Sequence, residues 1–332
     1  MTERIVIAGS TGFIGQAAMR RWQSQGHSVL TIDRRDTADA RWGDADAVAR
    51  VVDGATMLVN MAGRSVNCRY NDRNREAILQ SRISTTSELR DAVARVQSPP
   101  PVWINASTAT TYSHTTEAPH TEADDTGQIG FSEDVARAWE AAFMHGFLPA
   151  TRRVAARQTI VLGTSGLATR MLFTLGRFGL GGTQYDGPWI RHNRYRGLGI
   201  RRGSTAAAEP SAGRRTQGRQ RFSWIHVDDA VRVMEHIRDT PAISGPVNFA
   251  TDDARPNDEF MRLIRQTVGM PLGMPAFRWM LEPAMWALRT ESELVLKSRW
   301  VRSQVLADTG FSFEHPELPG ALADIWRELS RS

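Results

Sequence analysis

The sequence of 332 residues has few of the groups that would stabilise a secreted protein or anchor one in a membrane. Cys68 is the only cysteine, so an intrachain disulfide is excluded and a reducing compartment is expected. No apolar run approaches the roughly 20 residues of a membrane-spanning helix. The first expected strand begins at Arg4, which leaves no room for a signal peptide. We therefore expect a cytoplasmic protein without a membrane partner.

Lysine is also scarce, because Lys297 is the only one in the chain. Positive charge therefore comes from arginine, and it is unevenly distributed. Residues 191–221 hold nine arginines and one acidic residue, Glu209, although the whole chain has a net charge of only +5. The remainder of the chain is net negative, so the basic character belongs to this one segment.

A glycine-rich turn near the amino terminus is the strongest motif that is present. The apolar run 4–8 predicts a buried strand, residues 16–22 predict a helix, and Gly9, Gly12 and Gly15 lie between them. This order is typical of the first half of a dinucleotide-binding unit. Gly9 would allow a tight exit from the strand, Gly12 a close approach of pyrophosphate, and Gly15 close packing of helix on strand. The phosphates would meet backbone N–H groups at the positive end of the helix.

Alternation of strands and helices continues through the first half of the chain. We expect further strands at 28–32, 57–63, 102–105 and 154–162, and helices at 46–52, 72–96 and 133–144. Such alternation predicts an α/β fold, a Rossmann-like doubly wound parallel sheet with helices on both faces. A sheet of this kind binds ligands at the carboxyl ends of its strands.

The pattern changes in the second half, which suggests a division into domains. Residues 1–170 would form the dinucleotide-binding domain, to which 222–250 return, and 251–332 would form a small carboxyl-terminal α+β substrate domain. Residues 171–221 form a glycine- and arginine-rich insertion whose composition indicates a mobile loop. Its arginines would suit a nucleotide diphosphate. Attraction to nucleic acid or another polyanion, or a merely solvated loop, would explain them equally well.

The end of the second expected strand carries two opposing signals for the cofactor. Asp33 lies about twenty residues beyond the glycine turn, where the fold meets the adenosine ribose, and its carboxylate favours NAD. Arg34 and Arg35 follow, and their guanidinium groups favour the 2′-phosphate of NADP. NADP and NAD both remain open from the sequence.

Several motifs together resemble the extended short-chain dehydrogenase/reductase superfamily. They are Gly9-x-x-Gly12-x-x-Gly15, Ser107-Thr108-x-x-x-Tyr112 and Trp224-Ile225-His226-Val227-Asp228-Asp229. More narrowly, the chain resembles the YfcH-type group of nucleoside-diphosphate-sugar epimerase family proteins with a DUF1731-type carboxyl-terminal region. That resemblance rests on Asn60-Met61-Ala62-Gly63, Ser81-Arg82, Trp139-Glu140-Ala141-Ala142, Gly179-Leu180-Gly181-Gly182 and Gly310-Phe311-x-Phe313-x-x-Pro316-x-Leu318.

The resemblance implies a set of residues around NADP(H). They are Gly9, Ser10, Thr11, Gly12, Phe13, Ile14, Gly15, Asp33, Arg34, Arg35, Met61, Ala62, Gly63, Arg82 and Ile160. Family members more often have a small neutral residue where this chain has Asp33, which bears on the choice between NADP and NAD.

The catalytic dyad of the superfamily, Tyr-x-x-x-Lys, is absent. Residues 74, 116, 189 and 199, four beyond each tyrosine, are Asn, Thr, Trp and Gly. Aligning on Trp139-Glu140 places Ser132 at the tyrosine position and Ala136 at the lysine position. A free phenol is only about one part in a thousand ionised at pH 7, so a lone tyrosine would be a weak base.

Other groups remain as candidates for catalysis. Thr108, with Ser107 beside it, stands where the superfamily has its substrate-polarising hydroxyl, and Tyr112 is a candidate acid. For His226 and Asp229 we favour a structural role, with one carboxylate of the Asp228-Asp229 pair capping a helix. No cluster has metal-ligand spacing, so no metal is expected.

These observations lead to two hypotheses. The first is an NAD(P)-dependent epimerase or oxidoreductase that acts on a nucleotide-sugar-like small molecule, with nucleic acid a less favoured partner and a homodimer suggested by analogy. The second is a catalytically silent NAD(P)-binding regulatory protein, because the dyad is missing.

Overall fold

The structure is a computed structural model that describes residues 2–127, 130–187, 194–200 and 216–331. Its centre is a seven-stranded sheet, ordered β11-β6-β5-β4-β1-β2-β3, in which every neighbouring pair is parallel. The strands are β1 (Arg4–Ala8), β2 (Ser28–Asp33), β3 (Ala40–Arg41), β4 (Met57–Asn60), β5 (Val102–Thr108), β6 (Arg152–Gln158) and β11 (Gly245–Phe249). The predicted α/β fold is confirmed.

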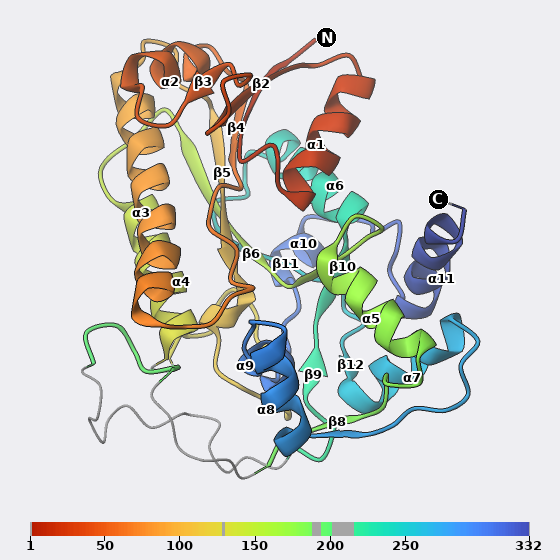
Figure 1. Cartoon of the computed structure of the whole chain (residues 1–332). Helices are drawn as coiled ribbons and strands as arrows, with labels where there is room; N and C mark the ends of the chain where they lie inside the picture. Colours follow the sequence, from red (N-terminus) through yellow and green to blue (C-terminus); the bar gives the residue numbers. More distant parts are fainter. Residues whose placement is uncertain (1, 128–129, 188–193, 201–215, 332) are drawn as a thin grey trace.

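Helices cover both faces of this sheet (Figure 1). One face packs against α1 (Phe13–Ser24) and α6 (Val227–Asp239), the other against α2 (Ala45–Val52), α3 (Asp72–Arg95) and α4 (Phe131–Met144). Ile5 and Ile7 of β1 point to the first layer, and Val6 and Ala8 to the second. All four are fully buried, which explains why β1 is continuously apolar and not alternating.

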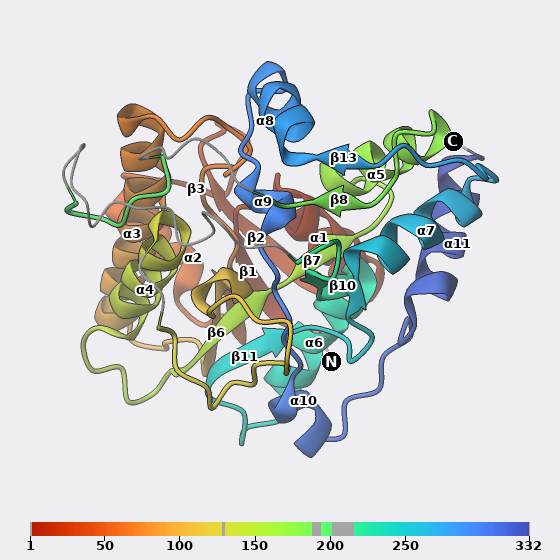
Figure 2. The same ribbon diagram turned by 90° about the horizontal axis from the view of Figure 1, so that it is seen from below.

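A smaller carboxyl-terminal region has a hydrophobic core of its own. It packs α5 (Leu167–Arg177), α7 (Asn257–Thr267) and α11 (Leu318–Leu329) around Phe173, Phe260 and Leu322. Figure 2 shows these three helices together, away from α3 and α4. Short strand pairs join the region to the sheet, namely β7 (Ile160–Leu162) with β10 (Trp224–His226), β9 (Arg221–Phe222) with β12 (Arg255–Pro256), and β8 (Gln184–Tyr185) with β13 (Ala276–Phe277).

The remaining helices are short. They are η1 (Ala109–Thr111), α8 (Arg278–Ala287), α9 (Glu293–Leu296) and α10 (Gln304–Asp308). Among the described residues, no helix has both the length and the apolar character needed to cross a membrane.

Two expectations about local structure were wrong. The strand expected at 154–162 is two strands, because the N–H and hydroxyl of Thr159 both donate to the Phe249 carbonyl and the chain leaves the main sheet. Beyond Thr159, β7 pairs with β10 instead. The glycine- and arginine-rich insertion expected to begin at residue 171 instead begins inside the helix α5, whose apolar side pairs with α7 and buries Phe173.

Candidate functional site

A cavity of about 500 Å³ opens at the carboxyl edge of the sheet, where the amino-terminal half meets the carboxyl-terminal region. One end is lined by the glycine turn, with Gly12, Phe13, Ile14 and Gly15. The middle is lined by Met61, Ala62, Gly63, Arg82, Ala106, Ser107, Thr108, Gln158 and Thr159. The far end is lined by Tyr70, Phe131, Ser132, Leu294 and Arg299, among others. The cavity therefore runs from the expected phosphate site to the expected catalytic residues.

The glycine turn is shaped by backbone packing at two of its three glycines. Gly9 has φ +85°, and a Cβ there would lie 2.7 Å from the backbone nitrogen of Ala62. A Cβ on Gly15 would collide with the Gly9 carbonyl oxygen. Gly12 has no such neighbour and precedes the first turn of α1, whose N–H groups lack helical acceptors. The N–H groups of Gly9 and Gly12 donate to the carbonyls of Ile32 and Gly9, so the donors that a ligand in the cavity could use are those of the first turn of α1.

Asp33 at the end of β2 is tied to its own surroundings. Ser10 Oγ donates to Asp33 Oδ2 at 3.2 Å, and the backbone N–H of Arg35 donates to Oδ1 at 2.6 Å. The Arg35 guanidinium adds an ion pair at 2.8 Å. Burial opposes ionisation, but these hydrogen bonds outweigh it and lower the pKa of the Asp33 carboxyl. Arg34 is exposed, and its side chain makes no hydrogen bond or ion pair within the described part of the chain.

Arg82 of α3 turns its guanidinium toward the cavity wall. Its Nη1 donates to the carbonyls of Arg64 and Ile78, each at 3.0 Å, and the guanidinium carbon lies 5.0 Å from the centre of the Trp139 ring. Burial lowers the pKa of Arg82 to about 10, so it stays charged at neutral pH. No carboxylate of the described residues pairs with it, which leaves the charge available to a ligand.

Ser107 and Thr108 close β5 and both line the cavity, but their hydroxyls have different partners. Ser107 Oγ donates to Glu140, whose carboxylate pairs with Arg157 through two hydrogen bonds of 2.9 and 2.8 Å. Thr108 Oγ1 donates to Thr110 Oγ1 at 3.0 Å and caps η1. Of the two, only Thr108 has a neutral hydroxyl partner that a substrate oxygen would readily replace.

Tyr112 and Ile160 do not reach the cavity. The Tyr112 hydroxyl accepts from Arg157 at 2.7 Å and donates to Asn248 at 3.0 Å, and its ring stacks on His120. Burial raises the pKa of the Tyr112 phenol. Ile160 packs in the carboxyl-terminal core. Tyr112 therefore supports the end of the sheet, and the geometry gives no support to the expected role as an acid.

The tyrosine that does line the cavity is Tyr70, which the sequence reasoning did not single out. Arg299 and Leu294 were missed as well. They come from segments far apart in the chain, and no motif of the superfamily marks them. Ser132 and Ala136, which stand where the dyad would be, both line the cavity. Their alignment with the dyad was the one feature of the sequence that could have indicated which residues lie at this end of the site.

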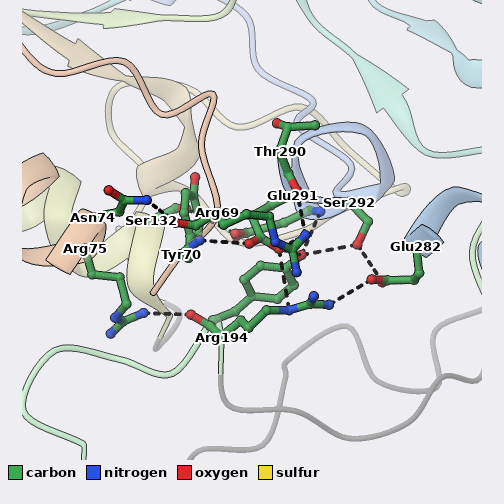
Figure 3. Close-up of polar contacts among 12 residues, drawn as sticks. Arg69, Tyr70, Asn74, Arg75, Ser132, Arg194, Glu282, Thr290, Glu291 and Ser292 are labelled. Carbon is green, nitrogen blue, oxygen red and sulfur yellow. Dashed lines mark hydrogen bonds and ion pairs between the residues drawn. The ribbon is translucent and has the colours of Figure 1, made fainter. Parts of the chain in front are cut away.

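The carboxyl-terminal region is joined to the loop before α3 by a cluster around the buried Glu291 (Figure 3). The Tyr70 backbone N–H donates to Glu291 Oε1 at 2.8 Å, and the Tyr195 hydroxyl donates to Oε2 at 3.1 Å. Arg69 and Arg194 are within 3.3 and 3.5 Å of the same oxygen. Figure 3 shows Arg69, Tyr70 and Arg194 converging on this carboxylate. The cluster fixes Tyr70 in the cavity wall.

Part of the arginine-rich segment belongs to that cluster, contrary to the expectation of a mobile loop. Arg75 of α3 donates to the carbonyls of Arg194 and Arg196, each at 2.8 Å. Arg194 pairs with Glu282 at 2.8 Å, and Arg196 pairs with Asp72. The arginines at 191, 201, 202, 214 and 215 lie outside the described residues.

His226 and Asp229 lie outside this cavity and support the fold. The cap of α6 is the imidazole of His226, which accepts from the Asp228 N–H at 3.3 Å, so the expectation that a carboxylate caps this helix was wrong. Asp229 is fully buried and accepts from the N–H groups of Glu314 and His315, each at 2.8 Å. His226, Asp228 and His315 approach one another closely, but capping occupies the Nδ1 lone pair and leaves the proton on Nε2, which would oppose metal binding.

Comparisons with known proteins find similar sequences along nearly the whole chain. Residues 5–138 match the NAD dependent epimerase/dehydratase family, and residues 277–325 match DUF1731, a domain of unknown function. Epimerase family protein SDR39U1 of Bos taurus is 28% identical over 330 residues, which cover 97% of this chain and 99% of that protein. Epimerase family protein YfhF of Bacillus subtilis is 26% identical over 329 residues, which cover 97% of each.

Solved structures extend the similarity to three dimensions. The crystal structure of human epimerase family protein SDR39U1 (isoform 2) with NADPH has a TM-score of 0.81 at 25% identity, covering 98% of this chain and 100% of that chain. MoeE5 in complex with UDP-glucose and NAD shares the fold, with a TM-score of 0.67 at 19% identity and 99% of both chains covered. The resemblance inferred from the motifs is confirmed: the amino-terminal part of the chain matches the NAD dependent epimerase/dehydratase family, a segment near the carboxyl-terminal end matches DUF1731, and the whole chain is similar to epimerase family proteins.

Proposed function

We propose that the protein binds NADP(H) in the cavity and acts as an oxidoreductase or epimerase on a nucleotide-sugar-like substrate. The single observation that carries the proposal is the continuity of the cavity from the first turn of α1 to Thr108 and Ser132. A dinucleotide fits this layout, with its pyrophosphate at the amino-terminal end of α1 and its nicotinamide toward β5. When bound, it would accept or return a hydride at nicotinamide C4.

The choice of NADP over NAD is argued from the charges around β2. Both oxygens of Asp33 already accept hydrogen bonds, from Ser10 and Arg35. The exposed side chain of Arg34 has no hydrogen-bond or ion-pair partner among the described residues, so it is the group available for a 2′-phosphate. Human SDR39U1, the similar protein crystallised with NADPH, is consistent with this choice.

Calorimetric titration with NADPH, NADH and their oxidised forms tests the proposal. We expect NADPH to bind at least about tenfold more tightly than NADH, since one charge-assisted contact contributes about 1.5–3 kcal/mol. Arg34→Ser should remove most of that preference, whereas Asp33→Ser should release Arg35 and not weaken NADPH binding. Arg50→Ala, an exposed arginine of α2, is the matched control. If neither dinucleotide binds, the proposed function fails.

The substrate class rests on the far end of the cavity. Arg299 lines it together with Tyr70 and Phe131, and Arg82 lies in the middle of the cavity, which gives cations for a diphosphate and rings for a base or sugar. MoeE5, a protein with the same fold, has been crystallised with UDP-glucose. Consumption of NADPH or reduction of NADP⁺ with sugar nucleotides, measured against a Gly12→Trp variant that blocks the turn, tests this class.

A catalytically silent regulatory protein is the second candidate, and a specific observation favours it. Ser132 and Ala136 occupy the cavity wall where the superfamily dyad would stand. Tight NADPH binding without turnover of any sugar nucleotide would support this candidate. We retain a homodimer and a cytoplasmic location as further proposals, which light scattering of the purified protein and cell fractionation test.

A further inference from the structure

A line of polar groups leads from the far end of the cavity into the protein. Tyr70 and Ser132 both line the cavity. Ser132 Oγ donates to Oε2 of Glu293, the first residue of α9, at 3.2 Å. Glu293 itself is not part of the lining, so Ser132 is the link between this carboxyl and the cavity. Ser132 is also the residue aligned with the superfamily tyrosine.

Glu293 is surrounded by charged and titratable groups from several elements. One neighbour is an acid, Glu133 of α4. The other titratable groups that interact with Glu293 are Lys297, Arg299, Tyr70 and Tyr195. Its own backbone N–H donates to the Tyr195 hydroxyl at 3.3 Å. Burial, followed by repulsion from Glu133, raises the pKa of the Glu293 carboxyl to about 7, against the lowering effect of Lys297 and Arg299.

Lys297, the only lysine of the chain, determines which of the two carboxyls keeps its charge. Its ammonium pairs with Glu133 Oε1 and donates to the Thr110 carbonyl at 3.1 Å. Both Lys297 and Glu133 are buried. Glu133 therefore has a committed cation, whereas Glu293 has a hydroxyl, so Glu293 is the carboxyl that holds a proton more readily.

We propose that Ser132 and Glu293 form a proton relay that serves the cavity in place of the missing Tyr-x-x-x-Lys dyad. This inference rests on the proposed function. In the oxidation of a substrate alcohol, the hydroxyl proton passes to Ser132 Oγ while the serine proton passes to Glu293 Oε2. A bound oxidised nicotinamide would supply the acceptor for the hydride that leaves the substrate carbon as it becomes a carbonyl carbon. Reduction runs the same transfers backward, and Glu293 returns the proton.

Each member of the relay suits its position. Ser132 accepts one proton as it gives up another, so the pKa of its hydroxyl need not be shifted. The pKa of Glu293 is raised to about 7, and a general acid or base is most effective when its pKa is near the working pH. Tyr70 is unsuited to be the base because burial raises the pKa of its phenol. Its backbone is fixed by Glu291, which keeps Tyr70 in the wall of the cavity that Ser132 also lines.

The first test measures the proton on Glu293 without turnover. The full chain is titrated through neutral pH, with and without NADP⁺, while the carboxylic-acid band is followed by infrared difference spectroscopy. We expect one carboxyl to titrate near pH 7. Glu293→Gln should remove it, and Glu117→Gln, at an exposed site, should retain it. Ser132→Ala should raise its midpoint, because the serine hydrogen bond stabilises the carboxylate. A neutral-range band that persists in Glu293→Gln, or no such band in the wild type, overturns the relay.

The second test measures the reaction, with UDP-glucose as the probe. Wild-type reduction of NADP⁺ should rise with pH up to about 7 and then level off, because the base form of Glu293 is needed. Glu293→Gln should lose this dependence and about 10²-fold in rate, and Ser132→Ala a similar factor. An unchanged pH profile in Glu293→Gln contradicts the relay. If the wild type turns over no sugar nucleotide, the proposed function fails, and the infrared titration alone decides whether Glu293 holds the proton.

Discussion

At one end of the cavity the wall comes from a single stretch of the chain, residues 12–15. At the other end it is side chains from segments far apart in the chain, with Tyr70, Ser132 and Arg299 meeting around one space. The first end needs only a strand, a turn and a helix to form. The second end needs the DUF1731 region to dock against α3 and α4, which the Glu291 cluster and the Lys297–Glu133 pair accomplish. A cofactor site can therefore be local, while a reaction site is assembled.

The largest expected effect is on the reaction rate, and it follows from removal of the Thr108 hydroxyl. Thr108→Ala should lower the rate of NADP⁺ reduction by a sugar nucleotide about 10²–10³-fold, as expected for the loss of one donor to a reacting oxygen. NADPH binding should be unchanged, because the glycine turn is untouched. Thr174→Ala, which removes an exposed hydroxyl bonded within α5, is the control. Equal rates in both variants would remove Thr108 from the mechanism.

A change at the cofactor end should have an intermediate effect. Gly9→Ala forces an alanine to φ +85° and pushes its Cβ to 2.7 Å from the Ala62 backbone nitrogen. We expect a loss of about 1–3 kcal/mol in unfolding free energy from the strain, with a further loss from the collision, and weakened NADPH binding. Gly54→Ala shares the positive φ, +71°, but would meet nothing within 4 Å, so chemical denaturation of the pair separates strain from collision. Equal stabilities would show that the close approach is not needed.

The smallest effect concerns the pH dependence of stability at the reaction end. The native pKa of Glu293, about 7, lies above its ordinary value of 4.5, so the native state binds more protons between these limits. This contribution is fully present below about pH 4.5 and is lost as the pH rises to 7, by up to about 1 kcal/mol per pH unit. Glu293→Gln should abolish it, as measured by denaturant unfolding at several pH values.

His226 must be separated from that measurement, because it acts in the opposite direction. Burial, aided by the neighbouring His315, lowers the pKa of His226 to about 4. The unfolded chain therefore binds more protons between about 4 and 6.5, and stability rises with pH across this window. The difference between wild type and Glu293→Gln isolates the Glu293 contribution. A difference that does not vary with pH would contradict the raised pKa.

Sequence reasoning succeeded where neighbours in the chain are also neighbours in space. The positive φ of Gly9 and the burial of Ile5-Val6-Ile7-Ala8 follow from a strand that must turn into a helix. Prediction from the sequence failed where a residue forms its hydrogen bonds with residues distant in the chain. Thr159 ends one strand through the Phe249 carbonyl, and Arg157 takes the Tyr112 hydroxyl out of the site. The local sequence around Thr159 or Arg157 does not indicate which distant residue each will contact.

The sequence by itself determined the parallel α/β sheet, the glycine turn and the absence of a Tyr-x-x-x-Lys dyad, because these depend on residue order and on short-range geometry. Only the tertiary structure decided that Tyr70, not Tyr112, faces the cavity and that Lys297 lies against Glu133 beside Ser132. Burial and opposite charge drew these residues together across more than 160 positions of the chain. Burial and charge pairing depend on distances in the folded structure and not on separation along the sequence.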